Sequence, residues 1–208
     1  MAFILYLTIN IFFHNSSALE FYNTFIPSQE NYDYLQYNIA DVTNGKAAKE
    51  FKEYSEDSID KNAFYIRIDK INLFKYVVKD VDPRYQEVYV KSWESGVSHG
   101  KFTAYPDQIG ITYLFAHAVS NKAEAVNQNA WFTYLDELEI GDEVIVYYAA
   151  KKYTYSVSDI KIVSPNATGF YTGASPVSLL RMQYCGPPTG SLNSRTLVDA
   201  VLINTKNI

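Results

Sequence analysis

The chain has little of the residue types that stabilise a small protein by cross-linking. Its 208 residues include one cysteine and three histidines, so it can form no internal disulfide and lacks the paired Cys and His ligands of a structural zinc site. Basic residues are also few, since 18 Lys and Arg stand against 23 Asp and Glu. The basic residues form no cluster along the sequence, and we therefore expect no nucleic-acid partner.

The hydrophobic run at the amino end is too short to cross a membrane comfortably. It covers residues 2–13, whereas a spanning helix needs about 20 residues. The small residues Ser16 and Ala18 follow it as they would at a signal-peptidase cleavage site, although no Lys or Arg precedes it. We predict that residues 1–18 are an export signal or an N-terminal membrane anchor, with a buried strand as the alternative. Export or anchoring would place the remainder outside the cytoplasmic membrane.

Aromatic residues, by contrast, are abundant. The chain has 19 Tyr and 12 Phe, which together with Val and Ile suit the pleated, half-buried surface of a sheet. Short β-rich runs separated by turn residues begin near residue 63. They are AFYIRID, NLFKYVV, GITYLFAH, EVIVYYA, KYTYSVSDIKIV, SLLRMQYC and RTLVDAVLI. Seven or more strands predict an all-β barrel or sandwich.

The β-rich part is preceded by a segment of different texture. Residues 19–59 are polar, rich in Asn and Tyr and poorly periodic, apart from a helical pattern in GKAAKEFKEYSED, residues 45–57. We predict a tether with a short helix over 19–59 and one β-rich domain over 60–208.

One helix is expected inside the β-rich domain, in NQNAWFTYLDELEIGD, residues 127–142. Asn127 or Asn129 is a suitable cap and Gly141 a suitable end. Its apolar stripe, which we assign to the core, consists of Trp131, Leu135 and Leu138. In contrast, the stretch DVDPRYQE contains Asp82-Pro83 and is predicted to be a turn.

Three residues at strand ends carry the candidate chemistry. Cys185 closes the run SLLRMQYC just before the turn GPPTG, and His117 closes ITYLFAH. Arg195 begins the last strand ten residues after Cys185, a spacing that lets a hairpin bring the two side by side. Taken singly, each has a plain structural explanation, because most lone cysteines are buried hydrophobes. Together they offer a nucleophile, a proton carrier and a fixed positive fork.

The reaction that needs this combination is acyl transfer. A thiol with a pKa of about 8.5 is only partly ionised at neutral pH, and nearby cations increase its thiolate fraction. We expect His117 and Arg195 to be those cations. An imidazole also delivers a proton to the departing amine, and the planar guanidinium of Arg195 can stabilise the developing oxyanion.

The order of these motifs resembles the sortases, bacterial cysteine transpeptidases that attach proteins to the cell surface. The resemblance covers about residues 63–203 in four blocks. The first two are YIRIDKINLFKYVV and SGVSHGKFTAYPDQIGITYLFAHA. The others are WFTYLDELEIGDEVIVYY, similar to the family's Phe-x-x-Leu-x-x-Leu-x-x-Gly-Asp pattern, and YCGPPTGSLNSRTLVDAVLI, similar to its Cys-x-Pro-x-Gly stretch.

The resemblance implies a closed antiparallel β-barrel with a few short helices, and it implies roles for the three residues. Cys185 would attack a sorting motif near the carboxyl end of a substrate protein and form a thioacyl enzyme. His117 would protonate the leaving amine, and Arg195 would hold the substrate backbone and the oxyanion. The acceptor would be an amine on a peptidoglycan precursor or a pilin lysine. His99 corresponds to a histidine that the family does not use in catalysis, and His14 lies in the export segment.

No cofactor is expected. Some sortases bind calcium, but the acidic residues here are too scattered to assign such a site. The chain departs from the family beside the catalytic residues, where Tyr184 precedes the cysteine and Ala116 the histidine. We expect both to crowd the cleft and so to affect the sorting motif rather than the reaction. Two alternatives stay open: a cysteine hydrolase using the same residues, and a non-catalytic barrel that binds peptides or cell wall.

Overall fold

The computed structural model describes residues 59–167 and 174–208. Eight strands lie in these residues: β1 (Tyr65–Ile68), β2 (Leu73–Val81), β3 (Val97–Gly100), β4 (Gly110–Phe115), β5 (Glu143–Tyr148), β6 (Lys151–Val163), β7 (Ser178–Cys185) and β8 (Arg195–Asn207). The helical segments described are α3 (Gln86–Trp93) and the 3-10 turns η3 (Asp69–Ile71), η4 (Lys122–Glu124) and η5 (Leu135–Glu137). The predicted all-β class with few short helices is confirmed.

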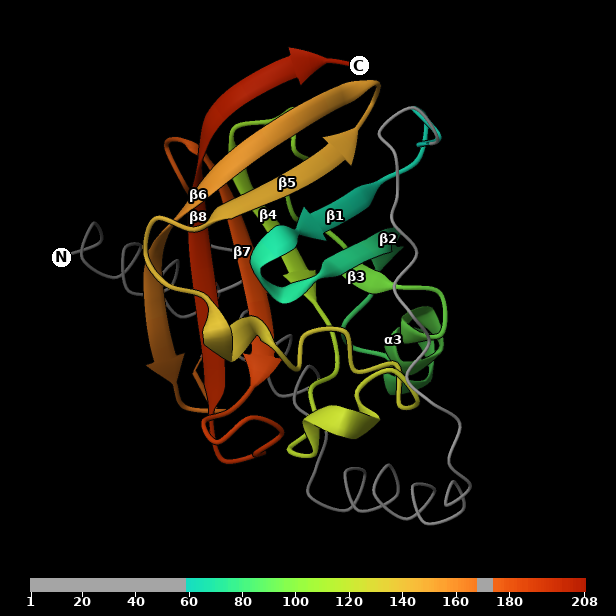
Figure 1. Ribbon diagram of the computed structural model, residues 1–208, viewed down its shortest axis with the longest axis vertical. Coiled ribbons are helices and arrows are strands. Elements are labelled where there is room, and N and C mark those ends of the chain that lie inside the picture. Colours follow the sequence, from blue (N-terminus) through green and yellow to red (C-terminus); the bar gives the residue numbers. More distant parts are fainter. Residues whose placement is uncertain (1–58, 168–173) are drawn as a thin grey trace, which may run out of the picture.

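The strands close into a barrel in the order β1-β2-β3-β4-β7-β8-β6-β5. Neighbours run antiparallel except in the pairs β2–β3 and β4–β7, which are parallel. A parallel pair needs a crossover connection, and α3 belongs to the crossover between β2 and β3. Figure 1 shows α3, the β4–β5 connection and the β7–β8 loop toward the same end of the barrel.

The strands β4, β7 and β8 carry buried residues on both faces. Their inward residues fill the barrel and include Leu114, Leu180, Met182, Val198 and Ala200. Their outward residues form a second cluster with α3, which contains Tyr89, Tyr113, Phe115 and Leu197. Because side chains alternate along a strand, such two-sided burial identifies this part of the wall as covered by another element. That element is α3.

A buried ion pair fixes the register of β7 and β8 on the outer face. Arg181 Nε and Nη2 donate to the two carboxylate oxygens of Asp199, both at 2.6 Å, and the Lys161 amine donates to Asp199 at 2.9 Å. Burial pushes the pKa of Asp199 upward, but the hydrogen bonds from Arg181 and Lys161 outweigh it and hold that pKa below its usual range. The carboxylate therefore stays ionised in the folded wall.

Removing that carboxylate should destabilise the barrel strongly. We expect Asp199→Asn to lower the free energy of unfolding by about 3–5 kcal/mol, because the buried Arg181 guanidinium loses the charge that compensates its burial. Denaturant unfolding at neutral pH measures the loss. The control is Arg181→Leu combined with Asp199→Leu, which removes both charges and should cost less than Asp199→Asn alone. A single variant as stable as the unchanged protein would contradict this role.

The helix predicted in residues 127–142 is wrong. The segment forms turns and the short η5, because Asn129 adopts a left-handed conformation with φ 53° that interrupts a right-handed helix. The hydroxyl of Thr133 accepts from the Val119 amide at 3.1 Å and fixes the segment as a folded loop. Leu135 and Leu138 are nonetheless buried in the core, as their spacing predicts.

Two elements were not predicted. The predicted turn at Asp82-Pro83 is confirmed, because Pro83 and Arg84 form a turn after β2, but the α-helix Gln86–Trp93 that follows this turn was not expected. Its only buried large side chain is Tyr89, so its apolar face was too narrow for a clear helical pattern. The strand β3 has only four residues, and Gly96 precedes it where a Cβ would lie 2.0 Å from the Tyr76 carbonyl oxygen. A glycine is therefore required for β3 to approach β2.

The predictions for residues 1–18 and 19–58 fall outside the described residues and stay predictions. Within the described ranges, the helices are too short or too polar to cross a membrane. The same ranges contain no group of three or more His, Cys, Asp and Glu side chains that could hold a metal ion. The expectation about calcium remains untested.

Candidate active site

The β7–β8 hairpin brings Cys185 and Arg195 side by side. They are directly opposite each other in the antiparallel ladder, as their ten-residue spacing predicts. Cys185 is a free, partly buried thiol at the end of β7. Arg195 is only 3% exposed, and its Nη1 donates to the carbonyl oxygens of Leu192 at 3.1 Å and Ser194 at 2.9 Å. The guanidinium is thus held by the loop that joins the two strands.

His117 lies just beyond the end of the neighbouring strand. The parallel ladder between β4 and β7 pairs Phe115 with Gln183. His117 follows Phe115 by two residues, as Cys185 follows Gln183, and adjacent strands are about 4.8 Å apart. The main chain of His117 is fixed by the Phe132 amide, which donates to its carbonyl oxygen at 3.1 Å.

All three predicted residues lie on the outer face of the wall. Cys185 alternates with the inward residues Met182 and Tyr184, and Phe115, two residues before His117, belongs to the outer cluster. Tyr89 of α3 provides an independent check. Burial raises the pKa of its phenol, Cys185 raises that pKa further and Arg195 lowers it. Tyr89 therefore lies near both side chains, and the site faces α3.

His117 is neutral in this environment. Burial lowers the pKa of its imidazole to about 4, so it carries no charge near pH 7. The expectation that His117 and Arg195 both act as cations is therefore wrong for the substrate-free protein, because the apolar surroundings of the imidazole disfavour its charged form. Arg195 is the cation beside the thiol, and the neutral imidazole is in the form that accepts a proton.

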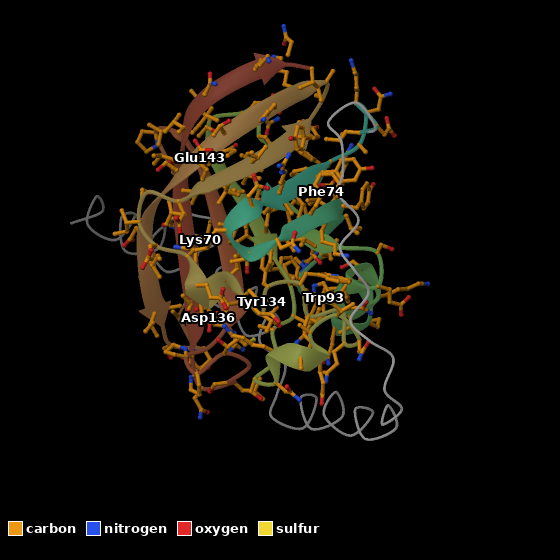
Figure 2. The ribbon with its side chains drawn as sticks, in the orientation of Figure 1. Lys70, Phe74, Trp93, Tyr134, Asp136 and Glu143 are labelled. Atoms are coloured by element: carbon orange, nitrogen blue, oxygen red, sulfur yellow. The ribbon has the colours of Figure 1, made fainter. Side chains whose placement is uncertain are left out.

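An indole ring covers one face of the His117 imidazole. Trp93, the last residue of α3, stacks on His117 with ring centroids 5.6 Å apart and planes inclined by 13°. Trp93 also contacts Tyr89 at 5.0 Å and Phe115 at 6.5 Å between centroids. Figure 2 labels Trp93 where α3 meets the rest of the fold. The sequence contained a signal for this contact, since Tyr89 and Trp93 are spaced i, i+4, but this spacing was not interpreted as a helix.

The β7–β8 loop is fastened to the connection that follows His117. Gly190 has φ +83°, and a Cβ there would lie 2.6 Å from the Ser120 amide nitrogen, so only glycine fits this close approach. The Gly190 amide donates to the Cys185 carbonyl oxygen at 2.8 Å. Thr189 donates to Asp136 at 2.8 Å. These contacts hold the loop of Cys185 and Arg195 against the loop of His117.

The departures at Tyr184 and Ala116 act from inside the barrel. Both are buried members of the main core, on the opposite face from Cys185. The prediction that they crowd a cleft is therefore wrong, because strand alternation points them inward. They fill the wall beneath the site instead.

His99 has a different environment from His117. It is fully buried on β3 and stacks on Tyr105 at 4.5 Å. Its Nε2 lies 3.1 Å from the Ala104 carbonyl oxygen and 3.1 Å from Thr103 Oγ1. These contacts agree with the structural role predicted for it. His14 lies outside the described residues.

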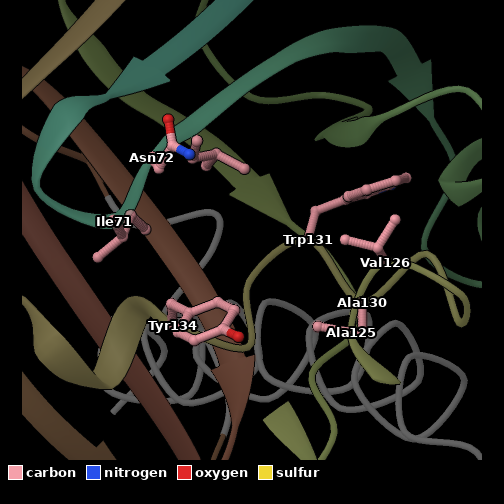
Figure 3. A pocket seen from close by; sticks show the side chains of 8 residues that line it. Ile71, Asn72, Ala125, Val126, Ala130, Trp131 and Tyr134 are labelled. Carbon is pink, nitrogen blue, oxygen red and sulfur yellow. The ribbon is translucent and has the colours of Figure 1, made fainter. Parts of the chain in front are cut away.

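A small apolar hollow lies beside the site. Figure 3 shows Trp131, Tyr134 and Ile71 around it. Trp131 is linked to the site because its indole nitrogen donates to the Trp93 carbonyl oxygen at 2.7 Å. His117, Cys185 and Arg195 are not among the residues that line this hollow, so it is separate from the predicted chemistry.

The comparisons with known proteins agree on one family. Residues 66–203 match the model of the sortase domain. No curated protein matches the chain. Among solved structures, sortase C-3 from Streptococcus pneumoniae is 19% identical, with a TM-score of 0.57 over 91% of this chain and 92% of that one. Sortase E1 from Streptomyces coelicolor, solved with a tripeptide in its active site, is 18% identical, with a TM-score of 0.54 over 71% of this chain and 91% of that one. The likeness in fold and the match over most of the chain show that this protein belongs to the sortase family.

Proposed function

We propose that the protein is a cysteine transpeptidase that cleaves a sorting motif near the carboxyl end of a substrate protein and joins that protein to an amine at the bacterial cell surface. The observation that carries the proposal is the direct pairing of Cys185 with Arg195 across the hairpin, at the level that His117 reaches from β4. A nucleophile, a neutral base and a fixed cation on one face are what acyl transfer requires.

The first half-reaction forms a thioester. The sulfur of Cys185 bonds to the carbonyl carbon of the motif while the His117 imidazole takes the thiol proton. Negative charge develops on the carbonyl oxygen, and the Arg195 guanidinium stabilises it. The imidazolium then gives its proton to the peptide nitrogen, the C–N bond breaks, and the carboxyl-terminal fragment leaves as an amine.

The second half-reaction uses the same groups in reverse. The acceptor amine bonds to the thioester carbon and gives its proton to His117, and the C–S bond breaks. The imidazolium returns a proton to the sulfur, so the enzyme is regenerated and one amide replaces another. On this proposal the acceptor is an amine of a peptidoglycan precursor or a pilin lysine, the chain is held at the outer side of the membrane through residues 1–18, and no cofactor takes part.

The proposal is tested with the purified full chain, a set of peptides carrying candidate sorting motifs, and hydroxylamine as the amine. Mass spectrometry should find the hydroxamate of the amino-terminal fragment as the main product. A carboxylic acid as the main product, even at saturating amine, would favour the cysteine hydrolase. Absence of any cleavage together with retained peptide binding would favour a non-catalytic barrel.

The pH dependence follows from His117. The pKa of about 4 lies below the ordinary value of about 6.5, so the base is neutral over a wider acidic range than usual. We expect the kcat/KM for peptide cleavage to stay constant as pH falls from about 7 to about 5, and to fall through about 4 as the imidazole is protonated. A decline centred near pH 6.5 would contradict an imidazole that is neutral over this range.

A further inference from the structure

Trp93 is the ring that shields His117. The two rings are nearly parallel, at 13° and 5.6 Å between centroids, so the indole covers one face of the imidazole. Burial is the cause of the lowered pKa of His117, and no hydrogen bond or charge among the described residues contributes to that shift. Stacking is therefore the contact that orients the imidazole, and the indole also keeps water from that face.

The neighbouring connection holds both members of this stack. Trp131 Nε1 donates to the Trp93 carbonyl oxygen at 2.7 Å, and the next residue, Phe132, donates its amide to the His117 carbonyl oxygen at 3.1 Å. The Lys75 amine lies 3.6 Å from the centre of the Trp131 ring and packs against its face. Two successive residues thus fix the end of α3 relative to the end of β4.

We propose, on the basis of the transpeptidase function above, that Trp93 is a positioning residue: its indole face holds the His117 imidazole toward Cys185 and excludes water from it, and Trp131 anchors Trp93 in that position. The titratable groups on the other packed elements are Cys185 of β7, Arg195 of β8 and Tyr89 of α3. The cause of the low pKa of His117 is burial rather than any of these charges. The shielding ring is therefore the group whose removal should change the protonation of the base.

The test is the titration of the His117 ring, followed by NMR in the full chain without substrate. The chain has three histidines, and His117→Gln identifies the signal of His117. We expect Trp93→Ala to raise the midpoint by about 2 pH units, toward the ordinary value of about 6.5. Trp93→Phe retains an aromatic face and should restore most of the low midpoint. The acid limb of kcat/KM should move with the titration.

A matched control is available at His99, the fully buried histidine of β3. Tyr105 stacks on His99 as Trp93 stacks on His117, so Tyr105→Ala removes a comparable ring and should leave the midpoint of His117 near 4. If Trp93→Ala does not fold, the proposal is tested with Trp131→Phe instead. This variant removes the hydrogen bond to the Trp93 carbonyl oxygen, and we expect it to raise the midpoint of His117 by less than 2 pH units.

An unchanged His117 midpoint in folded Trp93→Ala would overturn the proposal, and so would an unchanged midpoint in Trp131→Phe if that variant has to decide. An equal rise in Tyr105→Ala would also overturn it, since the effect would then be general loosening. The titration uses no substrate, so its failure is distinguishable from failure of the transpeptidase function. That function could fail while the titration behaves as expected.

Discussion

We expect replacement of Cys185 with alanine to abolish formation of both the ligated and the hydrolysed peptide while the barrel stays folded. The thiol supplies the only bond to the substrate in the proposed reaction, and no other cysteine exists in the chain to replace it. Cys185 is partly buried at a strand end and lies outside the core clusters, so its truncation costs little packing. Product analysis by mass spectrometry and a thermal melt measure the two effects.

The variant Cys185→Ser tests whether the thiol itself is required. A hydroxyl at the same position preserves the size of the side chain but is a much weaker acid than a thiol, so His117 cannot activate it to the same degree. We expect turnover of the serine variant to lie near the background of the alanine variant. Cleavage of peptide by folded Cys185→Ala would show that the nucleophile lies elsewhere.

Arg195→Ala should lower kcat/KM by at least 100-fold, because removal of one donor to a developing oxyanion typically has an effect of about 10²–10³-fold. The guanidinium is pre-positioned by the carbonyl oxygens of Leu192 and Ser194, so it does not have to reorganise during the reaction. Steady-state kinetics with a cleaved peptide measure the loss, and it should appear mainly in kcat if Arg195 acts on the transition state.

Two controls accompany the arginine variant. Arg195→Lys keeps the positive charge without the planar fork, and it should recover only part of the rate. Arg84→Ala removes an arginine whose carboxylate partner is Asp82, and it should leave kcat/KM unchanged. Near-normal turnover in Arg195→Ala would contradict the oxyanion role.

The strands and the pairing of their ends could be predicted from the sequence, because both depend on residues that are close together in the chain. Alternating aromatic and β-branched runs predicted seven of the strands, and the ten residues from Cys185 to Arg195 predicted their pairing. The strand β3 was not predicted, because its four residues, VSHG, show no β-forming pattern. The turn-rich segment 127–142 looked helical because Trp131, Leu135 and Leu138 have the right spacing, yet the left-handed Asn129 prevents a helix.

The packing around the candidate active site could not be predicted from the sequence. The neutrality of His117 depends on an indole 24 residues earlier in the chain, and the helix α3 that positions this indole was not predicted. Burial of an imidazole is a property of packing, and neither the identity of His117 nor its position at a strand end contains that information. The inward direction of Tyr184 likewise follows from strand alternation once the face of Cys185 is known.

The most direct test of the central claim, that Cys185, His117 and Arg195 act together in acyl transfer, is the mass of the intact protein after a rapid quench with a cleaved peptide. We expect an increase equal to the acyl fragment, located on Cys185, lost on addition of hydroxylamine and absent from His117→Ala. An acyl group on another residue, or turnover in which Cys185→Ala still accumulates it, would contradict the account.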